Sequence, residues 1–162
     1  MDIDINFENF LTLFPPAALP VSLTSESQRI IAQTQKPLNE KWVVRFLLRE
    51  DEWLDEYTEF MPCFSLPANK HFCGLVYWQA TLLGSSYELI CFTPKGEILD
   101  RMTLAGTKYE ENELVQTVCT IRPDWTIAQG QARLDAHRAK PIDAETQLAV
   151  LKITEEGEII EL

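Results

Sequence analysis

The chain has 162 residues, of which 46% are hydrophobic and 24% are charged, and these ordinary values predict a globular protein with a buried core. Fourteen basic and 25 acidic residues give a net charge of −11. A surface of this sign repels nucleic-acid phosphates and anionic lipids, which argues against nucleic acid or a membrane as partner. The charge suits a basic protein partner, or serves solubility alone.

The N-terminal part of the chain predicts short helices. A helix over residues 6–14 is capped by Asn6, and Pro15 ends it because an internal proline removes a backbone donor. Residues 17–37 form a loop, or in part a second helix over residues 25–31. The apolar face of the first helix comprises Phe7, Phe10, Leu11 and Phe14.

A longer helix is predicted over residues 39–61, although the β-branched Val43 and Val44 favour a strand as the alternative for residues 39–48. The helix is preferred because its apolar spacing continues further along the chain, and Pro62 closes it. On this prediction the stripe Trp53, Leu54, Tyr57 and Phe60 is buried, and the carboxylates of Glu52, Asp55, Glu56 and Glu59 are exposed.

From His71 onward the hydrophobic period changes to two, which is typical of strands. We predict about seven strands in residues 71–162, joined by polar connections that include residues 105–108 and 136–145. The fold class is therefore α+β: an antiparallel β-meander or partial barrel with the N-terminal helices (6–14, 39–61) packed on it. The chain forms a single domain, 1–162, with a helical part (1–62) and a meander (63–162). The strands are expected at residues 71–78, 87–92, 98–104, 113–121, 125–132, 148–153 and 159–162.

Two of the strand connections have nearly the same sequence. The segment Phe92-Thr93-Pro94-Lys95-Gly96-Glu97-Ile98-Leu99 recurs as Ile153-Thr154-Glu155-Glu156-Gly157-Glu158-Ile159-Ile160. Both read as tight hairpins in which Gly96 or Gly157 supplies a positive φ. A third link, residues 121–127, joins two further strands in the same way.

Catalytic and metal-binding signatures are weak. His71 lies near Cys63 and Cys73, but the spacing matches no zinc site, and no glycine-rich phosphate loop or nucleophile elbow is present. The four cysteines, which also include Cys91 and Cys119, are dispersed along the chain and are expected to be buried reduced thiols. We therefore predict no catalytic residue, no cofactor and no metal.

The strongest functional candidate is the acidic and aromatic stretch between residues 50 and 60. Carboxylates interleaved with aromatic rings offer charge steering and a large contact area to a basic protein surface. The competing interpretation is an amphipathic helix whose apolar side belongs to the core. Tyr77 and Trp78 point to opposite faces of a strand, so one of them is expected at the surface or under a helix. The predicted partner-binding residues are Glu52, Asp55, Glu56, Glu59, Tyr57 and Trp78.

The N-terminal residues Met1-Asp2-Ile3-Asp4 carry acids where a secretory signal needs basic residues, so the expected location is cytoplasmic. The pattern Phe10-Leu11-x-x-Phe14-Pro15, followed by Tyr87-x-Leu89-x-x-Phe92-Thr93-Pro94, resembles small Bacteroidota proteins without an assigned activity. The resemblance covers about half of the chain, rests on strand and turn residues, and implies a fold rather than a role.

These observations favour a non-enzymatic protein-binding domain, an immunity-type inhibitor or effector adaptor whose basic partner is a toxin or an effector. Two alternatives remain open. One is a small-molecule-binding β-barrel whose pocket is lined by Trp42, Tyr77 and Trp78. The other is a hydrolase that uses His71.

Overall fold

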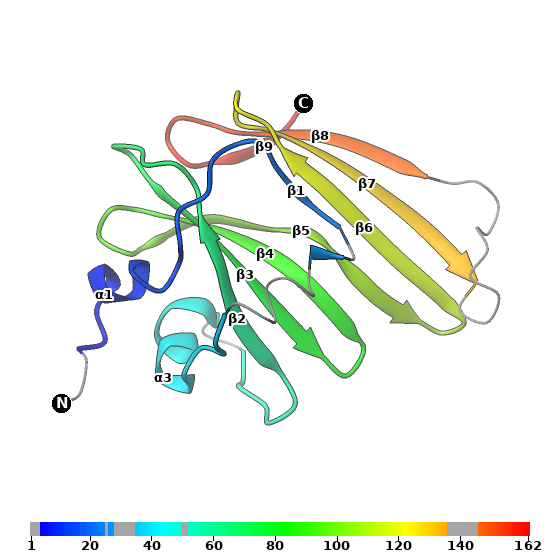
Figure 1. Ribbon diagram of the computed structural model, residues 1–162, viewed down its shortest axis with the longest axis horizontal. Helices are drawn as coiled ribbons and strands as arrows, with labels where there is room; N and C mark the ends of the chain where they lie inside the picture. The colour runs from blue at the N-terminus through cyan, green and yellow to red at the C-terminus, as the bar shows by residue number, and fades with distance from the viewer. Residues whose placement is uncertain (1–3, 25, 28–34, 50–51, 136–145) are drawn as a thin grey trace.

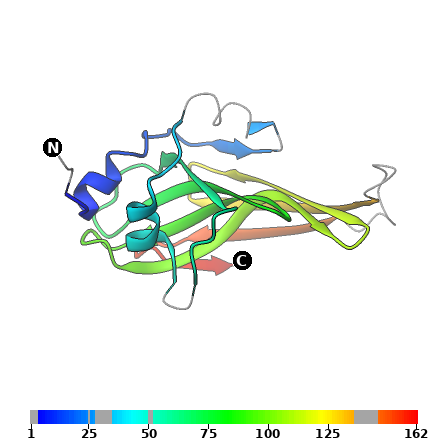
Figure 2. The same cartoon turned by 90° about the horizontal axis from the view of Figure 1, so that it is seen from below.

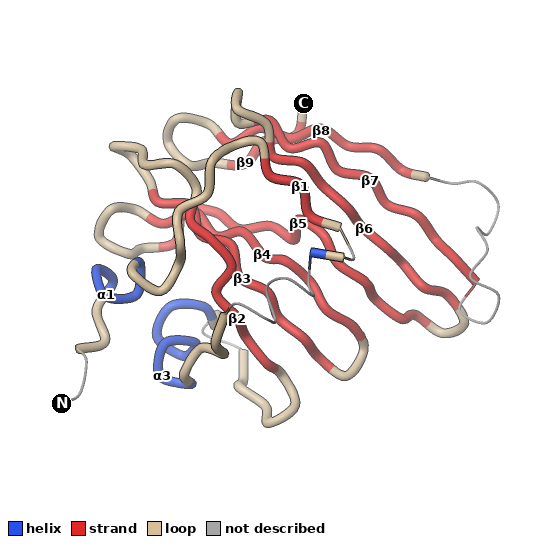
Figure 3. The backbone as a smooth tube through the Cα atoms, viewed as in Figure 1, coloured by secondary structure: helices blue, strands red, loops and turns tan. Residues whose placement is uncertain are grey.

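The protein is mostly one antiparallel sheet, as predicted (Figures 1 and 3). The computed structural model describes residues 4–24, 26–27, 35–49, 52–135 and 146–162. Strands β2 to β9 follow one another in the sheet in chain order, β1 pairs with β6, and the sheet is not closed. The strands are β1 (Val21–Leu23), β2 (Glu59–Ser65), β3 (Cys73–Thr81), β4 (Gly84–Phe92), β5 (Ile98–Glu110), β6 (Glu113–Ile121), β7 (Thr126–Asp135), β8 (Gln147–Ile153) and β9 (Ile159–Glu161).

The helical elements are shorter than predicted. They are α1 (Phe7–Leu11), α3 (Glu40–Trp42) and the π-helical η1 (Val43–Leu47). Asn6 caps α1 as expected, since its side chain accepts a hydrogen bond of 2.8 Å from the backbone N–H of Asn9. Among the described residues, no helix has the length and apolar character that crossing a membrane requires. The predicted helix over residues 25–31 and the connection 136–145 fall largely or wholly outside the described residues.

The prediction of one helix over residues 39–61 is correct only for its first third. The helix ends at Leu48, and Glu59 begins strand β2, which pairs with β3 at the edge of the sheet. Pro62 lies inside β2 rather than closing a helix, which an edge strand tolerates because its outer N–H positions are unpaired. Strand β2 is buried on both faces, so its apolar residues show no alternation by which sequence could identify it.

Two hydrophobic clusters lie on opposite faces of strands β2 to β4. Phe60, Tyr77 and Phe92 face the helices, where the ring of Phe10 stacks on that of Phe46 with 4.6 Å between centroids. The other face packs against β1 and the strands β6 to β8 through side chains such as Leu89 and Ile121. The helices therefore cover one face of half the sheet (Figure 2).

Strand β5 bends at a β-bulge. Its register against β4 shifts at Leu104, and only its second half pairs with β6. The residues predicted as a connection, 105–108, lie inside this strand, and the actual turn falls at Glu111, whose φ is 53°. Strand β5 is only partly buried there, so its residues are polar and lack the long apolar side chains by which a strand is identified in the sequence.

On the N-terminal side of the bulge, β5 no longer pairs with β6. There β1 pairs with the C-terminal end of β6 instead. Side chains bond to the backbone where the ladder is interrupted. The amide of Gln129 donates to the carbonyls of Thr103 and Leu104 at 3.0 and 2.9 Å, and the carboxylate of Asp100 accepts from the N–H of Ile159 at 2.8 Å.

The three predicted hairpins share one turn geometry. In each, the residue with positive φ donates its N–H to the carbonyl three positions earlier, at 2.9 to 3.0 Å. Gly96 has φ 95° and Gly157 has φ 87°, as the sequence predicts, and Trp125 takes the same position with φ 68°. The ring of Trp125 packs edge-on against Phe72 at 5.6 Å between centroids.

Candidate functional site

The segment that joins η1 to β2 places aromatic rings and carboxylates in solvent. We call residues 52–59 the acidic–aromatic loop; Glu59 is also the first residue of β2. Trp53 is 91% exposed and Tyr57 is 61% exposed, so the prediction that both rings are buried is wrong. That prediction required the helix to continue, and the chain leaves the helix at Leu48 instead.

Two features hold the loop in this arrangement. Leu54 is half-buried and packs against the helix-covered cluster, where it contributes to the lining of a small surface hollow with Leu38 and Val43. The carboxylate of Asp55 accepts hydrogen bonds from the backbone N–H groups of Tyr57 and Thr58 at 2.8 and 2.7 Å. Hydrogen bonds from Thr58, followed by that from Tyr57, hold the pKa of Asp55 below its ordinary value.

The loop is strongly acidic. The carboxylates of Glu52, Asp55, Glu56 and Glu59 are all exposed, as predicted. Glu52 forms an ion pair of 3.4 Å with Arg49, and among the described residues the other three have no ion-pair partner. Figure 1 shows the loop projecting from the rest of the molecule before β2 begins. The arrangement combines an uncompensated negative charge with two rings available for contact.

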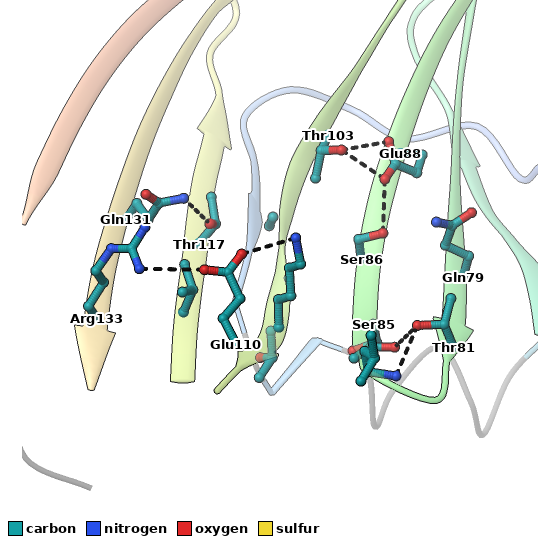
Figure 4. Close-up of a pocket in the computed structure, with 17 residues that line it drawn as sticks. Gln79, Thr81, Ser85, Ser86, Glu88, Thr103, Glu110, Thr117, Gln131 and Arg133 are labelled. Atoms are coloured by element: carbon teal, nitrogen blue, oxygen red, sulfur yellow. Dashed lines mark hydrogen bonds and ion pairs between the residues drawn. The ribbon is translucent and has the colours of Figure 1, made fainter. Parts of the chain in front are cut away.

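A second concave site lies on strands β3 to β7. It is a groove of about 480 Å³, and the sequence analysis did not predict it because its walls come from five strands (Figure 4). The alternation of Ser86 and Glu88 with the buried Tyr87 and Leu89 is the one local signal, since it marks a polar face on a central strand.

The two ends of the groove differ in charge balance. At one end the carboxylate of Glu88 accepts hydrogen bonds from the hydroxyls of Ser86 and Thr103, at 2.9 and 2.8 Å. At the other end cations and carboxylates pair: Lys108 with Glu110 at 3.0 Å and Arg133 with Glu110 at 3.5 Å (Figure 4). Arg133 also pairs with Glu113 at 2.7 Å.

Comparison with models of protein families, with curated proteins and with solved structures found no match. Function must therefore be argued from the two sites themselves.

Trp78 does not belong to either site. It is 7% exposed and lies in the cluster opposite the helices, so the prediction of Trp78 as a contact residue is wrong. Trp42 and Tyr77 are also buried, at 8% and 2%, and the phenol of Tyr77 accepts a hydrogen bond of 3.0 Å from Arg101. Trp42 and Tyr77 lie in the helix-facing cluster and Trp78 in the opposite one, so the three side chains do not line a common pocket as predicted. The indole N–H of Trp78 and the hydroxyl of Tyr87, on neighbouring strands, have no hydrogen-bond partner among the described residues.

The residues considered for chemistry are not brought together. His71 is exposed, and its backbone N–H donates to Asn69. All four cysteines are free thiols; burial raises the pKa of Cys63, Cys91 and Cys119 to about 12 and also raises that of the half-buried Cys73. Among the described residues, no three His, Cys, Asp or Glu side chains are close enough to hold a metal ion.

Proposed function

We propose that the protein is a non-enzymatic binding domain that engages a basic protein surface through the acidic–aromatic loop, as an immunity-type inhibitor or effector adaptor acting in the cytoplasm. The observation that carries the proposal is the 91% exposure of Trp53 beside Asp55, Glu56 and Glu59, which have no ion-pair partner among the described residues.

An exposed tryptophan is the side chain most suited to anchor a protein contact. Tryptophan and tyrosine bury about 150–250 Å² each and are enriched among the residues that dominate binding free energy. Trp53 and Tyr57 supply that area here, while Leu54 fixes the loop to the body of the protein. A partner pocket that receives Trp53 would gain this burial without unfolding any part of the described core.

The carboxylates give the second contribution. Unpaired surface charges accelerate encounter with an oppositely charged partner by long-range attraction, and salt screens them. Asp55, Glu56 and Glu59 have no cation partner within the part of the chain that the structure describes, and the net charge is −11, so the loop favours a partner whose contact surface carries lysine and arginine.

The test is affinity capture from the native host, using the wild-type chain and two variants with matched controls. Trp53→Ala is compared with Tyr109→Ala, an aromatic that is 53% exposed on β5. Reversal of Glu52, Asp55, Glu56 and Glu59 to lysine is compared with the same charge change on four exposed hairpin carboxylates, Glu97, Glu155, Glu156 and Glu158.

We expect a basic protein to be captured by the wild type and by both controls, and to be lost from Trp53→Ala. The loop reversal should slow association by about 10-fold or more at low salt, with a smaller effect near 1 M salt, where the screening length is about 3 Å. Because Trp53 is outside the core, Trp53→Ala should change the free energy of unfolding by less than about 0.5 kcal/mol. Equal capture by all five proteins, or capture of no basic protein, would reject the proposal.

A further inference from the structure

The groove on strands β3 to β7 (Figure 4) has a feature that the proposed function does not use. Four of its charged neighbours, Lys108, Glu110, Glu113 and Arg133, compensate one another through ion pairs. Glu88 is the one carboxylate lining the groove that has no cation partner among the described residues. Among the residues that line the groove, the charge without a partner is therefore the negative charge of Glu88.

The carboxylate of Glu88 is held in place and is not saturated. The hydroxyls of Ser86 and Thr103 donate to it and fix its orientation. A carboxylate has about four lone-pair sites, so acceptor capacity remains for a ligand. Glu88 is half-buried, which makes a charge-assisted hydrogen bond there stronger than one at a fully exposed carboxylate.

A second acceptor lies on the neighbouring strand. Gln79 pairs with Ser86 across β3 and β4, so its side chain shares the face of Glu88, and its amide has no hydrogen-bond partner among the described residues. The Gln79 amide has its nitrogen nearer to β4 in Figure 4, and a half-turn of the amide brings its oxygen to that side. The oxygen and the carboxylate of Glu88 then match a group with several N–H donors. Ammonium and guanidinium groups are such donors, and both carry a positive charge that can pair with the carboxylate of Glu88.

Other ligand classes fit less well. An anion would face Glu88, and the two cations of the groove are already paired. A sugar is usually held by an aromatic ring under its apolar face, and the residues that line this groove include no aromatic. The volume of about 480 Å³ lies in the range of small-molecule sites.

We propose that this groove binds an organic cation, with the ammonium or guanidinium group on Glu88 and Gln79. The cation can be a free small molecule or an arginine or lysine side chain of a protein. The residues that line the groove include none of the acidic–aromatic loop, so the proposal does not depend on the function proposed above.

Titration of the full chain with agmatine, which carries both an ammonium and a guanidinium group, tests the proposal by amide chemical shifts. We expect agmatine to shift the amides of Gln79, Ser86 and Thr103. Glu88→Gln removes the charge and keeps the shape, and it should weaken binding at least 10-fold, whereas Glu97→Gln on an exposed turn and Trp53→Ala should bind like the wild type. If Glu88→Gln does not fold, Gln79→Leu replaces it, with several-fold weaker binding expected.

The source of the cation is distinguished by a second probe, an acetylated and amidated Gly-Arg-Gly peptide. Shifts of the same amides by the peptide with equal or tighter binding support a protein side chain, and agmatine binding without peptide binding supports a free small molecule. Absence of shifts with both probes at millimolar concentration overturns the proposal. Equal binding of agmatine to Glu88→Gln also overturns it, as do equal shifts with the neutral polyol xylitol.

Discussion

Replacing Gly157 with alanine tests the turn geometry that organises the sheet. Gly157 has φ 87°, and a Cβ built on it would lie 2.8 Å from the Cβ of Phe72 and 3.0 Å from a methyl carbon of Leu99. Phe72 is 2% exposed and cannot move outward, although Leu99 can. The substitution therefore adds both backbone strain and an overlap with a core residue.

The two effects have separate magnitudes. A non-glycine residue with left-handed backbone costs about 1–2 kcal/mol, and overpacking against a fixed ring costs about 1–3 kcal/mol. Alanine also restricts the unfolded chain, which returns about 0.4–1 kcal/mol. We expect Gly157→Ala to lower the free energy of unfolding by about 1–5 kcal/mol. For a chain of this size that corresponds to a fall in Tm of about 2–20 °C.

Gly130→Ala is the matched control. Gly130 lies in β7, and a Cβ there would make ordinary contacts of 3.5 Å with Leu148 and 3.8 Å with Val118. Its free energy of unfolding should change by less than about 1 kcal/mol. Urea and thermal unfolding of both variants are the assay. If Gly157→Ala is no less stable than Gly130→Ala, neither the positive φ nor the contact with Phe72 can be as described.

Two further predictions concern stability. Asp100→Ala should lower the free energy of unfolding in urea by about 1–3 kcal/mol, because it leaves the backbone N–H of Ile159 without its acceptor. Asp100→Asn keeps an acceptor oxygen and should lower it clearly less. Burial raises the pKa of Cys63, Cys91 and Cys119 to about 12, so on raising the pH these thiols ionise first in the unfolded chain. The stability that the neutral thiols contribute is therefore complete below about pH 9 and is lost as the pH rises to about 12. A free energy of unfolding that stays constant from pH 8 to 11 would contradict this.

The meander could be predicted because its signals are local. A period of two, with turn residues at fixed offsets, identifies strands such as β6, whose predicted bounds 113–121 match the structure. Strand β2 could not be identified in this way, because apolar residues fill both of its faces and imitate a helix. Strand β1 has three residues and depends on its contact with β6, which no local pattern records.

The two sites also differ in how far they could be predicted from the sequence. The composition of the acidic–aromatic loop was visible in the sequence, but the exposure of Trp53 was not, since helical spacing predicts a buried ring. The groove was not predicted at all. Glu88 and Gln131 are 43 positions apart in the sequence, and only the pairing of the strands between them brings both to the lining of one groove.

The separation of β5 from β6 also bears on the unpaired edges of the sheet. A strand that leaves its neighbour exposes a row of backbone groups, and such a row can recruit a strand from another chain. Here the amide of Gln129 occupies the carbonyls of Thr103 and Leu104, β1 covers the end of β6, and Asp100 binds the N–H of Ile159. The sheet can therefore open to enclose its core while the edges created by the opening are already engaged within the same molecule.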